Sequence, residues 1–321
     1  MARTTVGIVR GGTSNEYDLS LKTGAVMLST LPEDRYDVRD IFIDKRGFWH
    51  FRGIPSDPAR ALSQIDVVLS ALHGGVGEDG SVHRILDRAG VAYAGSSAYA
   101  SALAYHKARA RDALLSYGIR MPRGMHFTLT SDMTTADMAR RVFSAFGPPY
   151  ILKPVAAGAG HGIVIADSII ELPDMIGDLL DAFGAIVVEE FIRGREAVVA
   201  VLENFRDEEL YTLPPVRILL PPGARILGHE ERAQLDYRVP GDFSHAEKQE
   251  MAILARAAHR ALALSHFSRA DIIITSRGVP YLLEVNTTPK LHEGAVLPAA
   301  LEAVGSSVLE FLEHQIRLAR A

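Results

Sequence analysis

The sequence contains no cysteine. Disulfide bonds and thiolate metal sites are therefore excluded, and any bound metal must be held by oxygen or imidazole ligands. No apolar run approaches the roughly 18 residues that a membrane-spanning helix needs, and the four-residue apolar run before Arg10 is too short for a signal peptide. We expect a soluble, cytoplasmic protein that has no membrane contact.

Positive charge is also scarce, and lysine most of all. The 34 basic residues are fewer than the 39 acidic ones, and the net charge of −5 argues against a nucleic-acid binder, which shows a basic face. Small molecules are the expected partners. Only six of the basic residues are lysines, so each of them is informative: Lys22, Lys45, Lys107, Lys153, Lys248 and Lys290.

The remaining composition is that of a globular protein, with 48% hydrophobic and 23% charged residues in a chain of 321. One hydrophobic core rarely serves more than about 250 to 300 residues, so we expect two or three domains. No repeat or low-complexity tract interrupts the chain.

The amino-terminal part shows a β-loop-α pattern twice, which is typical of a parallel sheet with ligand loops at the carboxyl ends of its strands. Ser14 is placed to cap the first helix. No Gly-x-Gly-x-x-Gly follows the first strand, so a dinucleotide site is not indicated. The expected elements are strands at 4–9, 65–72 and 91–93, loops at 11–16 and 73–80, and a helix at 82–89.

The rest of the chain reads as an α+β structure. Two strands flank a glycine-rich loop and form a hairpin. A long polar connection at 227–244 is typical of a functional or a disordered loop. The expected elements are helices at 98–117 and 176–183, and strands at 150–154, 162–165, 185–192, 196–202, 216–220, 271–275 and 281–285.

The hairpin loop is a candidate phosphate site. Three glycines, Gly158, Gly160 and Gly162, allow backbone amides to approach an anion, and Lys153 places a positive charge beside them. Lys107 is the matching second cation. The alternative interpretations are a flexible hairpin tip and an exposed surface lysine.

The strongest cluster joins two of the last strands. Period-two alternation places Glu284 and Asn286 on one face of a strand, and Asp271 lies on the neighbouring strand. Two carboxylates and an amide oxygen suit Mg²⁺, which also takes substrate phosphates. Arg269 would then face the transferred phosphoryl group. Alternatively, these are exposed charges at strand ends.

Four motifs in this order resemble the D-alanine–D-alanine ligase family of the ATP-grasp superfamily, over essentially the whole chain. The resemblance implies an α/β and α+β architecture, an ATP-grasp fold with a Rossmann-like amino-terminal domain. Its expected domains are 1–97, 98–185 and 186–321, with ATP between the last two. The motifs are Gly11-Gly12-Thr13-Ser14-Asn15-Glu16, His73-Gly74, Gly77-Glu78-Asp79-Gly80 and Leu283-Glu284-Val285-Asn286-Thr287.

The resemblance also implies roles for residues on the ATP side. Lys107 and Lys153 would bind the phosphates. The segment that holds adenine through its backbone would be Glu189-Glu190-Phe191-Ile192, and Glu196 would bind the ribose. The ligands of Mg²⁺ or Mn²⁺ would be Asp271, Glu284 and Asn286.

On the substrate side, Glu16 would orient the ammonium of the first substrate, with His73 nearby. Arg269 would stabilise the acyl phosphate and the tetrahedral intermediate. The family activates a carboxylate with ATP and passes it to an amine, which forms a dipeptide for peptidoglycan, the cell-wall polymer. The resemblance also implies a cytoplasmic homodimer.

Four positions depart from the family pattern. Ala157-Gly158-Ala159-Gly160 replaces Glu-Gly-Ser-Ser, His229-Glu230 falls near the family's Lys-Tyr, and Ala295 replaces a serine that meets the second substrate. Lys290 replaces glycine, so its ammonium either pairs with the second substrate's carboxylate or points to solvent, while its backbone amide serves the oxyanion. These departures leave two alternatives: a ligase for another amino acid or hydroxy acid, and a catalytically weak ATP-binding protein.

Overall fold

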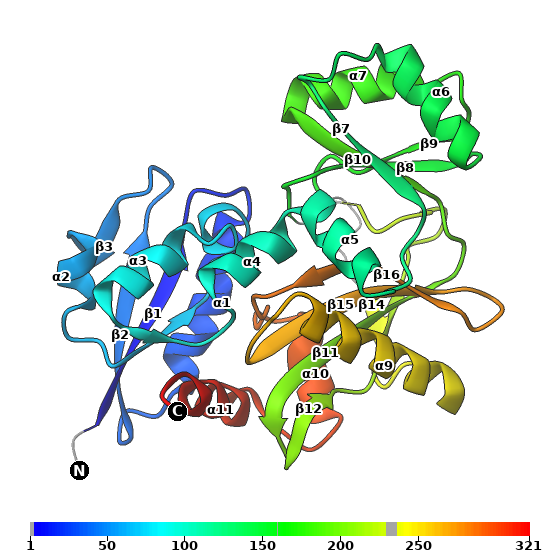
Figure 1. Ribbon diagram of the computed structural model, residues 1–321. Helices are drawn as coiled ribbons and strands as arrows, with labels where there is room; N and C mark the ends of the chain where they lie inside the picture. Colours follow the sequence, from blue (N-terminus) through cyan, green and yellow to red (C-terminus); the bar gives the residue numbers. More distant parts are fainter. Residues whose placement is uncertain (1–2, 159, 229–235) are drawn as a thin grey trace.

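The computed structural model describes residues 3–158, 160–228 and 236–321 (Figure 1). Three β-sheets follow one another along the chain, each with its own covering helices. Within the described residues, no helix is long and apolar enough to cross a membrane.

The first sheet is parallel at its centre, as the β-loop-α pattern predicted. Its strand order is β4-β3-β2-β1-β5-β6, with β1 parallel to both β2 and β5. The loops that carry the first two motifs follow β1 and β5. The strands are β1 (Thr4–Gly11), β2 (Tyr36–Ile43), β3 (Trp49–Phe51), β4 (Ile54–Pro55), β5 (Val67–Ser70) and β6 (Ala92–Tyr93), and the helices are α1 (Tyr17–Thr30), α2 (Pro58–Leu62), η1 (Gly75–Gly77) and α3 (Ser81–Ala89).

The expected cap of α1 is wrong. The N-cap residue is Glu16, which makes no capping side-chain bond. Ser14 Oγ accepts a hydrogen bond from the Glu16 backbone N–H at 3.1 Å and donates to the carbonyl of His73. Ser14 therefore ties the two motif loops together and leaves the Glu16 side chain for the site.

The single helix expected at 98–117 is two helices, α4 (Ala98–Tyr105) and α5 (Lys107–Ser116). His106 separates them with an extended backbone, and its Nδ1 accepts from the Arg109 N–H at 3.3 Å, which caps α5. The backbone N–H of Lys107 donates to Val155 O at 2.9 Å. The break therefore brings Lys107 to the glycine-rich hairpin.

The second sheet is antiparallel, in the order β7-β10-β8-β9, and α6 and α7 cover its outer face (Figure 1). All of β10 except its first residue, Ala185, lies beyond the expected boundary at 185/186, and yet the strand pairs with β7 and β8. The three-domain division stays a prediction. The bounds are β7 (Gly124–Thr128), α6 (Thr135–Ala145), β8 (Tyr150–Pro154), β9 (Val164–Ala166), α7 (Leu172–Phe183) and β10 (Ala185–Glu190).

The third sheet has the order β14-β13-β11-β15-β16, and β12 pairs with β11. Helices α5 and α9 share a hydrophobic core with one face of it. The expected loop at 227–244 contains β14, while 229–235 lies outside the described residues. The bounds are β11 (Arg195–Phe205), β12 (Glu208–Thr212), β13 (Val216–Leu219), β14 (Asp236–Arg238), α9 (His245–Ala261), β15 (Phe267–Ile274) and β16 (Pro280–Asn286).

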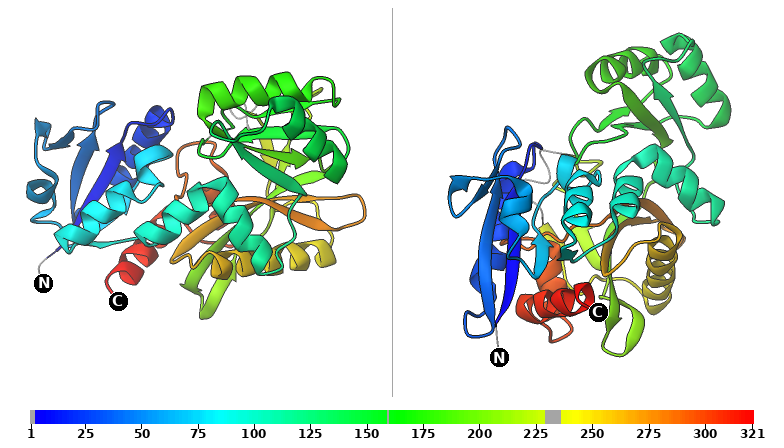
Figure 2. Two further views of the ribbon diagram at one scale, coloured as in Figure 1. Left: turned by 45° about the horizontal axis from the view of Figure 1, so that its top comes forward. Right: turned by 60° about the vertical axis from the view of Figure 1, so that its left-hand side comes forward.

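The last two helices, α10 (Val296–Glu302) and α11 (Val308–Ala319), join the first and third sheets. Figure 2 shows α11, in red, beside the first sheet in both views. One hydrophobic cluster contains Ile8 of β1, Leu69 of β5, Phe267 of β15 and Phe311 of α11. The carboxyl-terminal segment therefore fixes the first sheet against the third.

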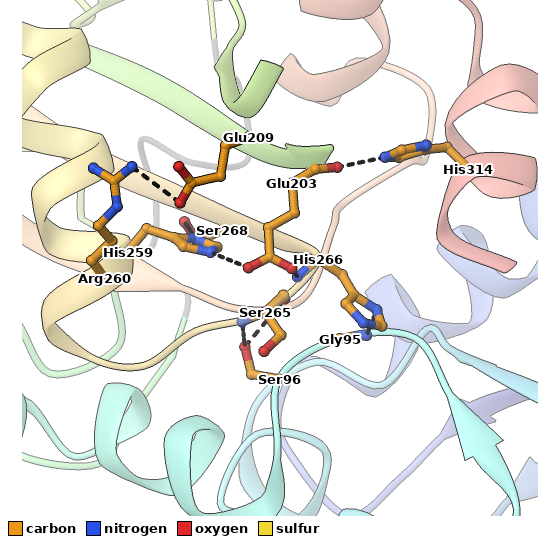
Figure 3. A network of polar contacts seen from close by, with 10 residues as sticks. All are labelled: Gly95, Ser96, Glu203, Glu209, His259, Arg260, Ser265, His266, Ser268 and His314. Atoms are coloured by element: carbon orange, nitrogen blue, oxygen red, sulfur yellow. Dashed lines mark hydrogen bonds and ion pairs between the residues drawn. The ribbon is translucent and has the colours of Figure 1, made fainter. Parts of the chain in front are cut away.

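A polar network reinforces this junction (Figure 3). Glu203 accepts from the His266 backbone N–H at 2.6 Å, contacts His259 Nε2 at 3.3 Å, and its carbonyl lies 2.7 Å from His314 Nε2. His266 Nδ1 in turn accepts from the Gly95 N–H at 3.0 Å. The network links the first sheet, through residues next to β6, to β11, α9 and α11.

His266 should make this junction sensitive to acid. Burial lowers the pKa of His266 in the fold, although the Glu203 charge opposes this. As the pH falls through about 6.5, the unfolded chain takes up the proton first, so stability decreases. In His266→Asn, the amide oxygen can still accept from Gly95, and asparagine tolerates the backbone φ of 64°. The Tm of this variant should depend less steeply on pH between about 7 and 5.5, measured by thermal unfolding.

The matched control is His245→Asn, because His245 is exposed at the start of α9. Its Tm should follow the wild-type pH dependence. An equal slope for all three proteins would contradict the assignment of acid sensitivity to His266.

Candidate active site

The predicted metal ligands lie on one face of the third sheet. In the antiparallel pair β15 and β16, Arg269 is opposite Asn286 and Asp271 is opposite Glu284. Residues directly opposite, and residues two apart on one strand, point to the same side of a sheet. The four side chains therefore converge, as the alternation of Glu284 and Asn286 predicted.

Arg269 and Asp271 bind each other on this face. Arg269 Nε and Nη2 donate to the two oxygens of Asp271 at 2.8 and 2.9 Å. Burial would lower the pKa of Arg269, but the Asp271 carboxylate outweighs it, and the net pKa is raised. The sequence predicted separate roles for the two residues and did not foresee this pair.

The third member of the set, Asn286, shows an unsatisfied polar group. Its Nδ2 is buried and has no hydrogen-bond partner among the described residues. The two ends of an amide are assigned from their contacts, and rotation by 180° exchanges oxygen for nitrogen. If the amide oxygen of Asn286 takes the position of Nδ2, it joins the two carboxylates of Asp271 and Glu284 in a set of oxygen ligands that fits Mg²⁺. No group of three or more His, Asp or Glu side chains suited to a metal occurs within 3–158, 160–228 and 236–321.

Both predicted phosphate-binding lysines reach this face. Lys107 Nζ lies 3.6 Å from Glu284 Oε2 and donates to Ala157 O at 2.8 Å. Lys153, at the end of β8, lines the same cavity as Lys107, Gly158 and Glu284. Ala159 of this loop lies outside the described residues.

A buried carboxylate fixes Lys153. Glu189 Oε2 lies 2.7 Å from Lys153 Nζ, and Glu189 Oε1 accepts from Arg111 Nη1 at 3.1 Å. All three side chains are 7% exposed or less. Arg111 was missed from sequence, because nothing distinguishes it from the other arginines of its helix.

Glu190 and Phe191, the next two residues of the predicted adenine segment, also make hydrogen bonds within the protein. Glu190 binds Arg123 through its carboxylate at 2.7 Å, and its backbone N–H donates to Arg123 O at 2.9 Å. The Phe191 N–H donates to Pro149 O at 3.1 Å. These two N–H groups already have partners, so among the backbone donors of the last three residues of the predicted adenine segment the N–H of Ile192 remains a candidate, and the backbone carbonyls stay candidates as acceptors.

A mainly apolar cavity is lined by residues of the second and third sheets. Ile151, Ile163, Ile192 and Leu283 are among the side chains that form its walls. Its polar groups include Glu196, and Lys153, Asp271 and Glu284 line it as well. An apolar cleft with a few placed polar groups is the usual form of a small-molecule site.

Glu16 and Lys290 form an ion pair in the cavity that the glycine-rich loop also lines. Its side chain is 4% exposed, and Oε1 accepts from Lys290 Nζ at 2.8 Å. The Lys290 side chain is 20% exposed, so the expectation that it points to solvent is wrong. Its ammonium donates to a protein carboxylate, that of Glu16.

Glu78 belongs to this region and received no role from the sequence. It lines the cavity that also contains Glu16, Lys107 and Lys290. Its Oε1 accepts from the Gly74 N–H at 2.9 Å. Burial raises its pKa, and the nearby Glu16 carboxylate raises it further. The motif that contains Glu78 was the available signal.

His73 lies behind the site. Its side chain is 1% exposed, its Nε2 is 3.0 Å from Thr23 Oγ1, and its Nδ1 has no partner among the described residues. Burial holds its pKa well below the usual value, and Lys290 lowers it further, so the imidazole is neutral. His73 supports the loop and is not among the residues that line the cavities containing Glu16.

Ala295 lines a third cavity, together with Glu16, Arg269, Lys290 and His292. It is the N-cap residue of α10, and its carbonyl accepts from Tyr237 Oη at 3.3 Å. This cavity adjoins the Glu16 pocket on the side away from the hairpin. The family's Lys-Tyr position, near His229-Glu230, lies outside the described residues.

Gly158 has no room for a side chain. A Cβ at this position would lie 2.0 Å from Glu16 Oε2. We expect Gly158→Ala to displace the Glu16 carboxylate and to lower kcat/KM for the acid substrate about tenfold or more, since one charge-assisted contact is worth that much. The Tm should change by less than about 2 °C, because the loop lies outside the core.

Gly147→Ala is the matched control, because nothing lies within 4 Å of a Cβ there. Kinetics of both variants with a saturating ATP concentration measure the effect. Normal acid kinetics for Gly158→Ala would show that Glu16 is not confined by this glycine.

Known proteins resemble the chain over almost its whole length. The family model described as D-ala D-ala ligase C-terminus matches residues 114–317. A D-alanine–D-alanine ligase of Desulforudis audaxviator is 31% identical over 320 residues, which cover 98% of each chain. Among solved structures, the VanG D-Ala:D-Ser ligase from Enterococcus faecalis has a TM-score of 0.86 at 25% identity, over 99% of this chain and 100% of that one. The D-alanine–D-alanine ligase from Bacillus anthracis, in complex with ATP, has a TM-score of 0.81 at 24% identity, over 98% and 97%.

Proposed function

Because the chain belongs to the D-alanine–D-alanine ligase family and is therefore an ATP-dependent, amide-forming ligase with the ATP-grasp fold, we propose that it joins a small carboxylic acid to the amine of an amino acid. The supporting observation is that Asp271, Glu284 and Asn286 share one sheet face with Lys107 and Lys153 beside them. This grouping suits the phosphates of ATP next to an acid substrate.

The reaction has two steps. A carboxylate oxygen of the first substrate attacks the γ-phosphorus of ATP, and the bond from that phosphorus to the β–γ bridging oxygen breaks, so ADP leaves. The amine of the second substrate then attacks the carbonyl carbon of the acyl phosphate. Phosphate leaves, the nitrogen loses a proton, and an amide remains. Positioning and charge stabilisation supply most of such catalysis.

The residues divide this work. Lys107 and Lys153 bind the phosphates and neutralise charge as ADP departs. Arg269, held by Asp271, stabilises the transferred phosphoryl group and the tetrahedral intermediate. Ile192 and Glu196 line the adenosine end of the cavity. The backbone of Lys290 and the position of Ala295 lie beside the second substrate.

A divalent cation completes the ATP site. Asp271, Glu284 and Asn286 would hold Mg²⁺, or Mn²⁺, and the charge of the cation would offset that of the ATP phosphates. We also propose a cytoplasmic homodimer, and an amino acid such as D-alanine as the amine substrate. The names of the relatives give D-alanine as a substrate, and the product would serve as a cell-wall precursor.

Substrate-stimulated ADP release tests this function. The enzyme, ATP and Mg²⁺ should release ADP rapidly only when a carboxylic acid and an amino acid are both present, and mass spectrometry should show the amide. A pure ATP-binding protein would give no stimulation. A flat response to a panel of D- and L-amino acids and hydroxy acids would overturn the proposal.

A further inference from the structure

The Glu16–Lys290 ion pair occupies the place where a substrate ammonium is expected. Lys290 follows β16, and Glu16 immediately precedes α1, so residues far apart in the chain build the pair. The Nζ to Oε1 distance is 2.8 Å, and the Glu16 side chain is 4% exposed. One oxygen of the carboxylate is therefore already bound to an ammonium of the protein itself.

The other oxygen is enclosed by backbone. A Cβ on Gly158 would lie 2.0 Å from Glu16 Oε2, and a Cβ on Gly74 would lie 3.0 Å from it. These two glycines thus press against the carboxylate from the hairpin and from the second motif loop. A substrate ammonium would therefore have to compete with Lys290 for the Glu16 carboxylate.

The charges in the pocket also disfavour a substrate ammonium. A substrate ammonium beside Lys290 would add a positive charge to a pocket that is lined by more cationic side chains than carboxylates. The cations are Lys107, Lys153, Arg269 and Lys290, and the carboxylates are Glu16, Glu78 and Glu284. A hydroxyl carries no such penalty. The lysine ammonium has three donors, of which Glu16 takes one, so the others can serve a hydroxyl or carboxylate oxygen.

We infer that the first substrate is a carboxylic acid without an α-ammonium group, such as a 2-hydroxy acid, and that Lys290 determines this specificity. The inference rests on the proposed function and names its acid substrate. The acid's carboxylate is still the group that takes the γ-phosphoryl of ATP, and ADP is still released. The second substrate keeps its amine, so the product is the amide of a hydroxy acid.

Trapping the acyl phosphate with hydroxylamine isolates the first step. Hydroxylamine attacks the carbonyl carbon, phosphate leaves, and a stable hydroxamate identifies the acid by mass spectrometry. The acids are offered in equimolar pairs with the same side chain: glycolate with glycine, and D-lactate with D-alanine. Because the amino acid of each pair can also take the acyl group through its amine, the activated acid is counted in the amide product as well as in the hydroxamate. Wild-type enzyme should form the hydroxy-acid hydroxamate in at least tenfold excess.

Two variants of Lys290 test whether its ammonium causes the preference for hydroxy acids. Lys290→Met removes the ammonium and should shift the hydroxamate ratio at least tenfold towards the amino acid, because Glu16 becomes available. Lys290→Arg keeps the charge and should keep the wild-type preference. Lys248→Met, a lysine on α9, is the control for loss of a lysine elsewhere.

Wild-type preference for the amino acids would overturn the inference, and so would an unchanged ratio in Lys290→Met. Wild-type competition decides the substrate class even if a variant fails to fold. If no acid gives a hydroxamate or ADP, the proposed function fails, and this inference fails with it. Amino-acid hydroxamates in excess would overturn the inference alone and leave the ligase function in place.

Discussion

Glu284→Gln should lower turnover about a hundred- to a thousandfold while the Tm stays within about 2 °C of wild type. Glu284 lies opposite Asp271 on the sheet face that would hold the metal, and Lys107 Nζ is 3.6 Å from its carboxylate. The amide keeps the shape but loses the charge. Loss of one preorganised charged group in such a site typically costs that factor. Steady-state ADP release and thermal unfolding measure the two effects.

Glu208→Gln provides the control, because Glu208 is an exposed carboxylate at the start of β12. It should retain normal turnover. The Mg²⁺ concentration that gives half the maximal rate should be higher for Glu284→Gln than for wild type, and unchanged for the control. Folded Glu284→Gln with wild-type turnover would remove Glu284 from the site.

Local patterns in the sequence predicted the elements that carry the motifs. Apolar runs that end at glycine-rich loops gave β1 and β5, and period-two alternation gave β16 with Glu284 and Asn286 on one face. The helix pattern did not reveal the break between α4 and α5. That break depends on the His106 cap and on Val155, the residue directly after β8, which makes a tertiary contact with Lys107.

Pairings within the site were harder to predict than its members. The sequence placed Arg269 and Asp271 near each other, but alternation alone does not show that they bind each other. The Lys290 contact with Glu16 joins residues 274 apart, and no local pattern predicts such a pair. The Rossmann-like first sheet and the third sheet must first pack together before these two side chains meet.

Glu189→Gln should lower the free energy of unfolding by about 3 kcal/mol and the Tm by roughly 5 to 10 °C. The carboxylate binds Lys153 and Arg111, and the three side chains are almost completely buried. Removing its charge leaves two buried cations without a counter-charge. The free-energy cost of an unpaired buried charge is much larger than the net stabilisation that an intact buried ion pair provides. Urea unfolding and thermal unfolding measure the loss.

The adjacent residue supplies the matched control. Glu190 pairs with Arg123, whose side chain is 63% exposed, so Glu190→Gln should cost less than about 1 kcal/mol. ATP should offset the loss in Glu189→Gln only in part. Its phosphates can return a counter-charge to Lys153 but not to Arg111, whose Nη1 lies 3.1 Å from Glu189 Oε1 in the wild-type protein. Saturating ATP should therefore recover some, and not all, of the Tm lost in Glu189→Gln. Equal stability of the two variants without ATP would show that the buried carboxylate does not hold Lys153 in place.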